Sequence, residues 1–321
     1  MRRLNMNKNN KAFILGSYHC CYSFTAKEMP SMGETVMGYR FKMSGGAKGH
    51  GQMLAAALAG AKVSGIMRVG DDEYGHLCIK DFERAGIDCT HVKIDKDHAT
   101  GAAGVMLNER GENIIIVVPG ANAQITARDI DDAKPMIREC SVAGFQFENN
   151  FDAIEYAIKE AHALGVETMV DPAPVVEFDE ELYRYITYMK PNEHEASLLS
   201  GIQVSDYETA VRAGRILLDK GVNKAVVITM GGSGAVLVER NGEKVFPCAP
   251  VPVRDTTSAG DTFAGAFVAG LASGMELSEA VIHAVCIAAC AVKRGPQESI
   301  FEFFPKEEEL ETMKENYRKI L

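Results

Sequence analysis

The sequence DTTSAGDTFAGA, residues 255–266, has residue types and spacing suited to phosphate chemistry. Small residues lead to Gly260 and Asp261, and a strongly apolar helical pattern begins directly after them. Gly260 is free to adopt backbone conformations that other residues resist, and small side chains let a backbone approach a ligand closely. The first N–H groups of a helix lack internal partners, and the helix dipole makes that end positive, so the segment predicts a phosphate-binding turn.

Asp261 would place a carboxylate beside the bound phosphate, which is electrostatically costly. The simplest rationale is a general base that takes a proton from a hydroxyl as this hydroxyl attacks phosphorus. The alternative is that Asp261 only caps the helix, since Asp is favoured at such positions. Residue type alone favours the cap, whereas the Ser-Ala-Gly approach and the rest of the chain favour the base.

Two further polar segments are expected to meet this turn at one edge of a sheet. Asn192 and Glu195 follow one expected strand, and the glycine-rich run TMGGSG at 229–234 follows another. Ligands of open α/β sheets bind beyond the carboxyl ends of the strands. Convergence of three segments at one edge is stronger evidence for a site than any segment alone.

Apolar runs that alternate with helical patterns predict the elements that carry these residues. Strands are expected at 12–16, 62–69, 142–147, 167–171, 185–190 and 225–229. Helices are expected at 49–60, 81–85, 153–164, 193–200 and 208–220. This alternation predicts a three-layer α/β/α fold with a mostly parallel central sheet.

Two segments, at about 18–44 and 98–118, break the alternation with short β patterns and turns. The second predicts a hairpin, with strands at 104–107 and 114–118. We expect the two segments to form a small β lid over a ligand, with an ordinary surface flap as the alternative. Without internal repeats or a flexible linker, residues 1–321 are expected to form one domain with this lid inserted.

Composition and charge argue against several classes of function. A net charge of −10 argues against binding to nucleic acid or to an anionic membrane. The eight cysteines lack CxxC pairs and zinc-finger spacing, which predicts free thiols in a reducing, cytoplasmic compartment. The polar first residues do not resemble a signal peptide, and no apolar run reaches the roughly 18 residues of a membrane span. The first expected strand lacks a following GxGxxG turn, which argues against a dehydrogenase.

Residues 255–268 resemble the carboxyl-terminal signature of the PfkB or ribokinase family of carbohydrate kinases. The resemblance extends along nearly the whole chain and is greatest to members of the ribokinase type. It includes PSMGETV at 30–36, GDDEYG at 70–75, GAN at 120–122, QFE at 146–148, DPAP at 171–174, PNEHEA at 191–196 and TMGGSG at 229–234. It implies a ribokinase-like three-layer fold with a β lid, and ATP-dependent phosphorylation of a sugar-like alcohol.

The resemblance also implies roles for particular residues. Asp261 is similar to the family's base, and Ser258, Ala259 and Gly260 resemble its anion hole. Asn192 and Glu195 resemble the pair that organises Mg²⁺, with Glu195 acting through water, which agrees with the preference of Mg²⁺ for oxygen ligands and retained waters. The remaining implied residues form two groups: Thr229, Gly231 and Gly234 in the nucleotide-binding turn, and Asp255, Thr257, Gly295 and Ser299 around a monovalent cation such as K⁺.

The residues expected to bind the acceptor depart from the family pattern. Gly51 stands where the amino-terminal glycine motif usually ends in an asparagine, and Cys21 stands where ribokinase-like members place an aspartate that binds sugar hydroxyls. A thiol is a weak hydrogen-bond partner, so ribose is in doubt as the acceptor. Lys48, Glu148, His19 and His50 are candidates for binding a different acceptor, such as one with an acidic group. The expected acceptor-binding residues are Cys21, Gly45, Gly46, Lys48, Gly51, Glu148 and Asp261.

We therefore expect a sugar kinase that transfers the γ-phosphate of ATP to a hydroxymethyl group, with a lid that closes over the substrates and excludes water. A nucleoside kinase on the same scaffold is the first alternative, although no aromatic pair in the sequence indicates a base pocket. A catalytically silent sugar-binding or regulatory protein is the second. Because unpaired strand edges invite pairing, the lid also offers a surface for a homodimer.

Overall fold

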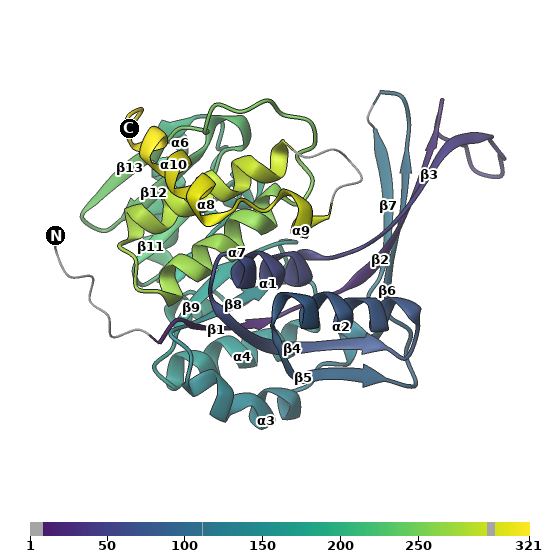
Figure 1. Ribbon diagram of the computed structural model, residues 1–321, viewed down its shortest axis with the longest axis horizontal. Helices are drawn as coiled ribbons and strands as arrows, with labels where there is room; N and C mark the ends of the chain where they lie inside the picture. Colours follow the sequence, from purple (N-terminus) through teal and green to yellow (C-terminus); the bar gives the residue numbers. More distant parts are fainter. Residues whose placement is uncertain (1–8, 111, 294–298) are drawn as a thin grey trace.

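The computed structural model describes residues 9–110, 112–293 and 299–321. Its central feature is a nine-stranded sheet with the order β13-β12-β11-β10-β9-β8-β1-β4-β5 (Figure 1). The strands from β5 to β11 run parallel to their neighbours, and β12 and β13 are added antiparallel at one edge. The strands are β1 Lys11–Leu15, β4 Lys62–Gly70, β5 Asp88–Asp95, β8 Val142–Gln146, β9 Glu167–Asp171, β10 Tyr188–Met189, β11 Ala225–Thr229, β12 Ala235–Glu239 and β13 Gly242–Phe246.

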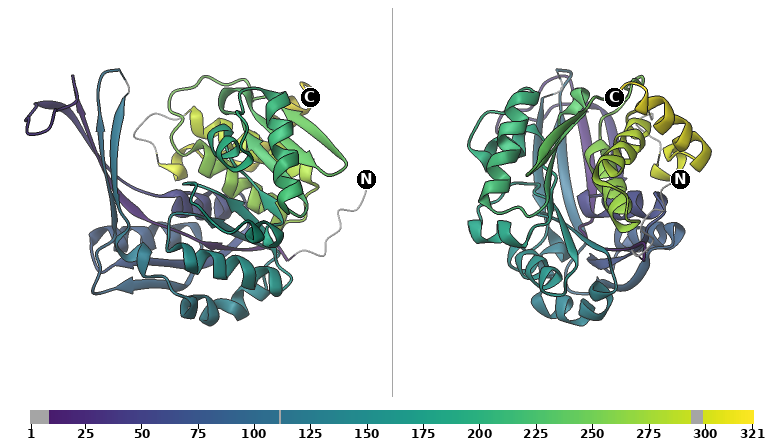
Figure 2. Two further views of the ribbon diagram at one scale, coloured as in Figure 1. Left: turned by 180° about the vertical axis from the view of Figure 1, so that it is seen from behind. Right: turned by 90° about the vertical axis from the view of Figure 1, so that its left-hand side faces the viewer.

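Helices cover both faces of this sheet, so the predicted three-layer α/β/α fold is confirmed (Figure 2). Side chains of β1 alternate between two cores: Ile14 packs with α1, α7 and α8, and Phe13 packs with α3, α4 and α6. A strand buried on both faces requires the continuous apolar run seen in β1. The helices on the first side are α1 Lys48–Leu58, α2 Glu73–Ala85, α7 Ala259–Ala272, α8 Leu277–Val292, α9 Ile300–Phe303 and α10 Glu307–Arg318. Those on the second are α3 Ala127–Arg138, α4 Phe151–Ala163, α5 Glu193–Ser200 and α6 Tyr207–Lys220.

The two irregular segments combine into one four-stranded sheet that projects from the body (Figures 1 and 2). Its order is β3-β2-β6-β7, in which β2 pairs parallel with β6, while β3 and β7 are the antiparallel edges. The strands are β2 His19–Ala26, β3 Gly38–Gly45, β6 Gly101–Leu107 and β7 Asn113–Val118. The expected hairpin is present, and the pairing between the two segments adds a contact that local patterns do not predict. We call this sheet the lid.

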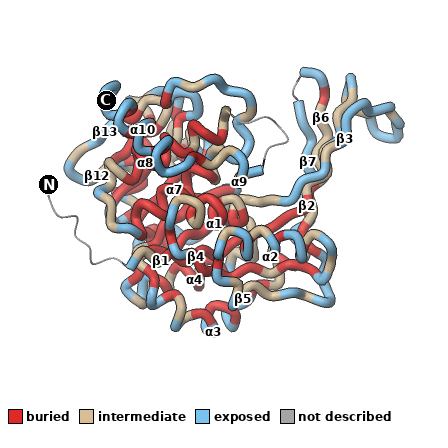
Figure 3. The backbone as a smooth tube through the Cα atoms, in the orientation of Figure 1, coloured by how far each residue is buried: buried red, intermediate tan, exposed pale blue. Residues whose placement is uncertain are grey.

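Burial separates the body from the lid. Buried residues are concentrated in the central sheet and in α1 and α7, whereas the outer half of the lid is mostly exposed or intermediate, with Asn108 in the turn after β6 as a buried exception (Figure 3). On β7, all five apolar residues from Ile114 to Val118 are about half exposed. Among the described residues, no helix combines the length and apolar character needed to cross a bilayer.

Some expected elements differ in extent. The expected strand 185–190 is wrong in length, because β10 has two residues and follows a 3₁₀ turn at Glu180–Tyr185. Helix α2 begins at Glu73 instead of residue 81, since Asp72 caps it by accepting a bond from the Gly75 N–H. The edge strand β5 and the β12–β13 hairpin were not expected. The β5 sequence mixes polar and apolar residues without a clear period, and its exposure is mixed as well.

Candidate active site

The candidate site lies at the carboxyl edge of the parallel strands, where α1 and α7 begin. Glu148 follows β8, Asp171 ends β9, and Thr229 ends β11. Helices α1 and α7 pack closely because Gly265 has no side chain: a Cβ there would lie 2.3 Å from the Gln52 carbonyl oxygen. This close packing brings the first turns of both helices to the same side of the sheet edge.

Asp261 is the third residue of α7, and Ser258 occupies the N-cap position. The cap interpretation of Asp261 is therefore wrong. The expectation that Gly260 carries the unusual backbone conformation is wrong as well, because the left-handed residue is Ser258, with φ of 62°. A Cβ added at Gly260 would meet only Lys190 Nζ, at 3.7 Å. The turn is thus tightened two residues earlier, which leaves the first N–H groups of α7 at the helix start.

The Asp261 carboxylate is surrounded by charged groups from several elements. Its Oδ1 lies 3.9 Å from Lys48 Nζ and 3.4 Å from Gln52 Nε2, which donates to it. Burial raises the pKa of Asp261, and the negative charges of Asp171 and Glu148 act in the same direction. Lys48 and Lys190 oppose this rise. A carboxylate with a raised pKa is a better proton acceptor, as a general base requires.

Glu148 and Lys48 are held beside Asp261 by the start of α1. Glu148 Oε2 accepts hydrogen bonds from Ser17 Oγ (2.6 Å) and from the Lys48 backbone N–H (3.0 Å). Burial raises the pKa of Glu148. Burial also disfavours the charge of the Lys48 ammonium, but Asp261, Asp171 and Glu148 together raise its pKa overall. The Lys48 ammonium is close to the carboxylates of Asp261 and Glu148, so it can bind an acceptor oxygen beside either of them.

A cavity of about 650 Å³ opens onto Asp261 between α1, α7, α9 and the base of the lid. Gly51 faces the base directly, since a Cβ there would lie 3.2 Å from Asp261 Cβ. Among the residues expected to touch acceptor, cation or phosphate, those lining the cavity are Cys21, Gly45, Gly46, Lys48, Gly51, Glu148, Thr257, Ser258, Asp261 and Ser299.

The lid side of the cavity combines apolar side chains with His19, Cys21 and the charged Lys42 of β3. Burial lowers the pKa of His19, and its Nε2 lies 3.3 Å from Asn122 Nδ2. Burial raises the pKa of the Cys21 thiol, which donates to the Gly46 carbonyl oxygen at 3.8 Å. Ala103 and Val117 complete this wall. An acceptor hydroxyl near Cys21 would therefore meet a weak partner, whereas the α1 side offers charged partners.

The glycines of the amino-terminal run fit close backbone approaches. A Cβ on Gly45 would lie 1.9 Å from the Tyr18 hydroxyl oxygen, and Gly46 has φ of 146°. Tyr18 is fully buried beneath this turn. The turn from β3 into α1 therefore lies flat against the body, which leaves the cavity open above it.

Asn192 and Glu195 form a reciprocal cap at the start of α5. Glu195 N donates to Asn192 Oδ1 (2.9 Å), and Asn192 N donates to Glu195 Oε2 (2.8 Å). Glu195 is buried, and burial together with Asp171 raises its pKa while Lys190 lowers it. This pair supplies oxygen ligands next to the β10 end, which fits a hydrated Mg²⁺ ion.

The glycine-rich turn lies beside this pair, because Thr229 N donates to the Pro191 carbonyl oxygen and Asn192 bridges to Thr229. Gly231 and Gly234 have φ of 46° and 101°. A Cβ on Gly234 would lie 2.0 Å from the Phe246 carbonyl oxygen. The turn thus requires glycine at 234 for two separate reasons.

Gly234→Ala should lower the free energy of unfolding by about 1–3 kcal/mol and weaken nucleotide binding, because the turn cannot close around the added methyl group. Denaturant unfolding and titration calorimetry with ATP measure the two effects. Gly242→Ala is the matched control, since a Cβ there meets nothing within 4 Å. Equal behaviour of the two variants would contradict the role of the turn.

The residues expected around a monovalent cation are partly brought together. Thr257 and Ser299 line the same cavity as Asp261, and Asp255 Oδ1 accepts from the Thr257 N–H at 2.8 Å. Gly295 lies outside the described residues. Among residues 9–110, 112–293 and 299–321, no group of three or more His, Cys, Asp or Glu side chains is arranged to hold a metal. A cation here would therefore depend on backbone and hydroxyl oxygens.

Several polar residues of the site had no predicted role. Gln52, Asp171 and Lys190 are buried next to Asp261, and Ser17 holds Glu148. Asp171 ends a strand, and Ser17 and Lys190 lie just after one, so position relative to strand ends was the available signal for these three, whereas Gln52 lies in the second turn of α1. Their mutual contacts depend on the tertiary fold.

The fold and the site together define a phosphotransferase with an alcohol acceptor: a helix start suited to an anion, a buried carboxylate beside it, and a lid. A model of the pfkB family carbohydrate kinases matches residues 13–300, and the chain belongs to this family. It is similar to a ribokinase of Haemophilus influenzae (33% identity over 288 residues, covering 89% of this chain and 94% of the relative). A deoxyribokinase of Salmonella typhimurium is similar to the same extent, with 33% identity over 288 residues and the same coverage, 89% and 94%.

The solved structures agree. The structure of Arabidopsis thaliana ribokinase complexed with ribose and ATP aligns with a TM-score of 0.85 at 26% identity, covering 95% of this chain and 98% of that one. The protein is therefore an ATP-dependent carbohydrate kinase of this family.

Proposed function

We propose that this protein transfers the γ-phosphate of ATP to a hydroxymethyl group of a sugar or sugar derivative. The observation that carries the proposal is the buried Asp261 carboxylate at the start of α7, in the cavity that Lys48 and Glu148 also line. The acceptor oxygen attacks the γ-phosphorus, its proton moves to Asp261, and ADP leaves with the electrons of the broken P–O bond. The backbone N–H groups of Ser258, Ala259 and Gly260 hold the transferring phosphoryl group.

The nucleotide is assigned to the neighbouring strand ends, where Asn192, Glu195 and the turn of Thr229, Gly231 and Gly234 lie together. Glu195 would hold Mg²⁺ through water, and the ion would supply charge compensation for the phosphates. Asp255, Thr257 and Ser299 are proposed to surround K⁺, with Gly295 as a further member of the set. Loss of activity on replacing K⁺ by a bulky organic cation would support this set.

The acceptor is proposed to be a sugar-like alcohol other than ribose. Support comes from Cys21 on β2 and Gly51 on α1, which offer no strong hydrogen-bonding group to a ring hydroxyl. Residues 1–321 are proposed to act as one domain in the cytoplasm, where the eight free cysteines would stay reduced. The lid segments at about 18–44 and 98–118 close over this acceptor.

A nucleoside is the second candidate acceptor. The cavity extends past Asp261 to Phe301 and Phe303 of α9, and the Arg84 guanidinium stacks 4.0 Å from the centre of the Phe301 ring. These groups are suited to stacking on a planar base. Higher kcat/KM for nucleosides than for the free sugars would favour this candidate.

The experiment that tests the function is ADP release by the purified protein with Mg-ATP and K⁺ across pentoses, deoxypentoses, hexoses, sugar acids and nucleosides. Activity on one class that disappears in Asp261→Asn would establish the kinase and identify its acceptor class together. If no acceptor in the panel leads to ADP release although ATP still binds, a sugar-binding regulatory protein would be favoured.

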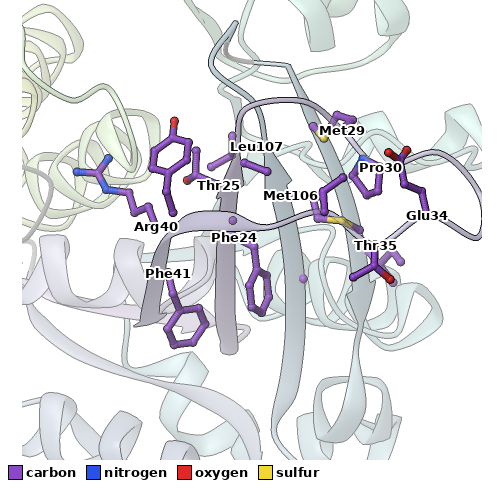
Figure 4. A pocket seen from close by; sticks show the side chains of 16 residues that line it. Phe24, Thr25, Met29, Pro30, Glu34, Thr35, Arg40, Phe41, Met106 and Leu107 are labelled. Atoms are coloured by element: carbon purple, nitrogen blue, oxygen red, sulfur yellow. The ribbon is translucent and has the colours of Figure 1, made fainter.

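The lid is also proposed to form a homodimer. One face has a pocket of about 710 Å³ lined by apolar side chains, among which Phe24 and Phe41 extend to the same side (Figure 4). Their ring centres are 5.1 Å apart, and both rings are half exposed. A second lid would bury this face, including Ile116 of β7.

Ile116→Lys should convert the dimer to a monomer, because Ile116 lines this pocket and is 60% exposed. Sedimentation velocity at micromolar concentration measures the change. Ile320→Lys, at another half-exposed isoleucine near the end of the chain, is the control and should leave the dimer intact. A monomeric wild-type protein would contradict this proposal.

A further inference from the structure

Four buried polar side chains form a connected chain behind Asp261. Gln146, the last residue of β8, donates its Nε2 to Gln52 Oε1 at 2.7 Å. Gln52 Nε2 donates to Asp171 Oδ2 at 2.8 Å and lies 3.4 Å from Asp261 Oδ1. Asp171 Oδ2 also accepts from Lys190 Nζ at 3.3 Å. All four side chains are at most 3% exposed, so their orientations are fixed by one another.

Lys190 extends this chain to the first turn of α7. Its Nζ donates to the Gly260 carbonyl oxygen at 3.4 Å and is the nearest atom to the space above Gly260. The ammonium group therefore lies beside the residue that immediately precedes Asp261. The network joins the ends of β8, β9 and β10 to both helices of the site.

A purely structural role does not explain a buried ion pair at this place. Removing Lys190 and Asp171 from water costs energy that their attraction repays only in part, and apolar pairs are commonly at least as stable. Asp171 Oδ1 and Gln146 Oε1 are also buried without a hydrogen-bond partner among the residues that the structure describes. Unsatisfied buried oxygens are uncommon and call for a functional or solvent-related reason.

We propose that Gln52, Asp171 and Lys190 are positioning residues for phosphoryl transfer. Gln52 holds the Asp261 carboxylate in the orientation that faces the acceptor, and the Asp171–Lys190 pair fixes the balance of charge around it. The proposal rests on the proposed role of Asp261 as the base. Although the three residues lie far apart in the chain, each of them acts by positioning Asp261.

The charges around Asp261 give this proposal a distinctive signature. The ionisable groups that face it are Lys48 from α1, Glu148 after β8, Asp171 at the end of β9 and Lys190 after β10. Burial raises the pKa of Asp261; Lys48 and Lys190 lower it, and Asp171 and Glu148 raise it further. Removing the charge of Asp171 and removing that of Lys190 must therefore move the pKa of the base in opposite directions.

The experiment compares Asp171→Asn, Lys190→Met and the double variant. Two quantities are measured: the acidic limb of the pH profile of kcat/KM, and the titration of the Asp261 carboxyl by carbon NMR without substrate. We expect Asp171→Asn to lower the pH of the acidic limb and the pKa of Asp261 by about one unit. Lys190→Met should raise the same two quantities by a similar amount. The double variant should return near the wild-type value, and it stays informative if the single Lys190 variant does not fold.

Gln52→Leu tests the orienting contact separately. It should lower kcat by about 10- to 100-fold, because misorientation of a reacting group is costly, while the KM for ATP stays unchanged. A Gln52→Leu variant that keeps the wild-type kcat and loses kcat/KM only through a higher KM for ATP would contradict an orienting role.

Arg68→Met is the matched control, since Arg68 pairs with the buried Asp129 at 2.9 Å on another part of the sheet. It should lower thermal stability without moving the acidic limb. Shifts of the same sign in both single variants, or no shift at all, would overturn the network. Near-normal turnover of Asp261→Asn would instead overturn the assignment of the base, and the NMR titration would still report on the network.

Discussion

Asp261→Asn is expected to lower kcat by about 10²–10⁴-fold while ATP binding stays nearly unchanged, because the amide cannot take the proton of the attacking hydroxyl. Steady-state ADP release and titration calorimetry measure the two quantities. Asp129→Asn makes the same chemical change at another buried aspartate and should retain turnover. Near-normal turnover of the Asp261 variant would reduce Asp261 to an acidic residue in the first turn of a helix.

The same variant should be more stable than the wild type at neutral pH. Because burial raises the folded-state pKa of Asp261 above its unfolded value, the ionised carboxylate is a destabilising feature at pH values above that raised pKa. The stability gained by Asn should shrink as the pH falls through the folded pKa toward the unfolded one. Thermal unfolding across pH 3–8, about the range that spans ordinary and raised carboxyl pKa values, measures this trend.

The double substitution Cys21→Asp and Gly51→Asn should raise kcat/KM for ribose by roughly 10- to 100-fold, because each unpaired hydroxyl costs about 1–3 kcal/mol. Gly51 faces Asp261 closely, so the new side chain must extend along the cavity while α1 shifts by a few tenths of an ångström. Coupled assays with ribose, and with the acceptor found in the panel, measure the change.

The control makes the same residue changes away from the cavity, as Cys248→Asp with Gly242→Asn. Position 242 is open, and Cys248 is half-buried near the β13 end. If neither the cavity variant nor the control changes kcat/KM for ribose, the acceptor lies elsewhere in the cavity.

Local patterns were sufficient for the parts of the fold that depend on short stretches of chain. The strands β9 and β11 and the helix α5 have the predicted bounds, since apolar runs end at clear signals such as Asn192 and Gly201. The convergence of Asp261, Glu195 and Thr229 near one edge followed from the rule for parallel sheets. Fold class and the region of the site were therefore predictable.

Long-range geometry was not predictable in the same way. The parallel pairing of β2 with β6 joins residues about eighty positions apart, and no local pattern specifies such a register. The left-handed backbone at Ser258 was assigned to Gly260 because residue type favours glycine. The contact of Gln52 with Asp171 depends on how α1 and β9 are placed relative to each other, which no local pattern specifies.

The lid does more than cover the cavity, because its own strands supply part of the acceptor wall. His19 and Cys21 belong to β2, Ala103 to β6 and Val117 to β7, whereas Ser258 to Asp261, the residues proposed to handle the phosphate, belong to the body. The lid therefore supplies one part of the acceptor wall, and Lys48, Gly51 and Glu148 of the body supply the other. Exchanging the lid segments between relatives is expected to change part of the acceptor preference without altering the residues proposed for the transfer step.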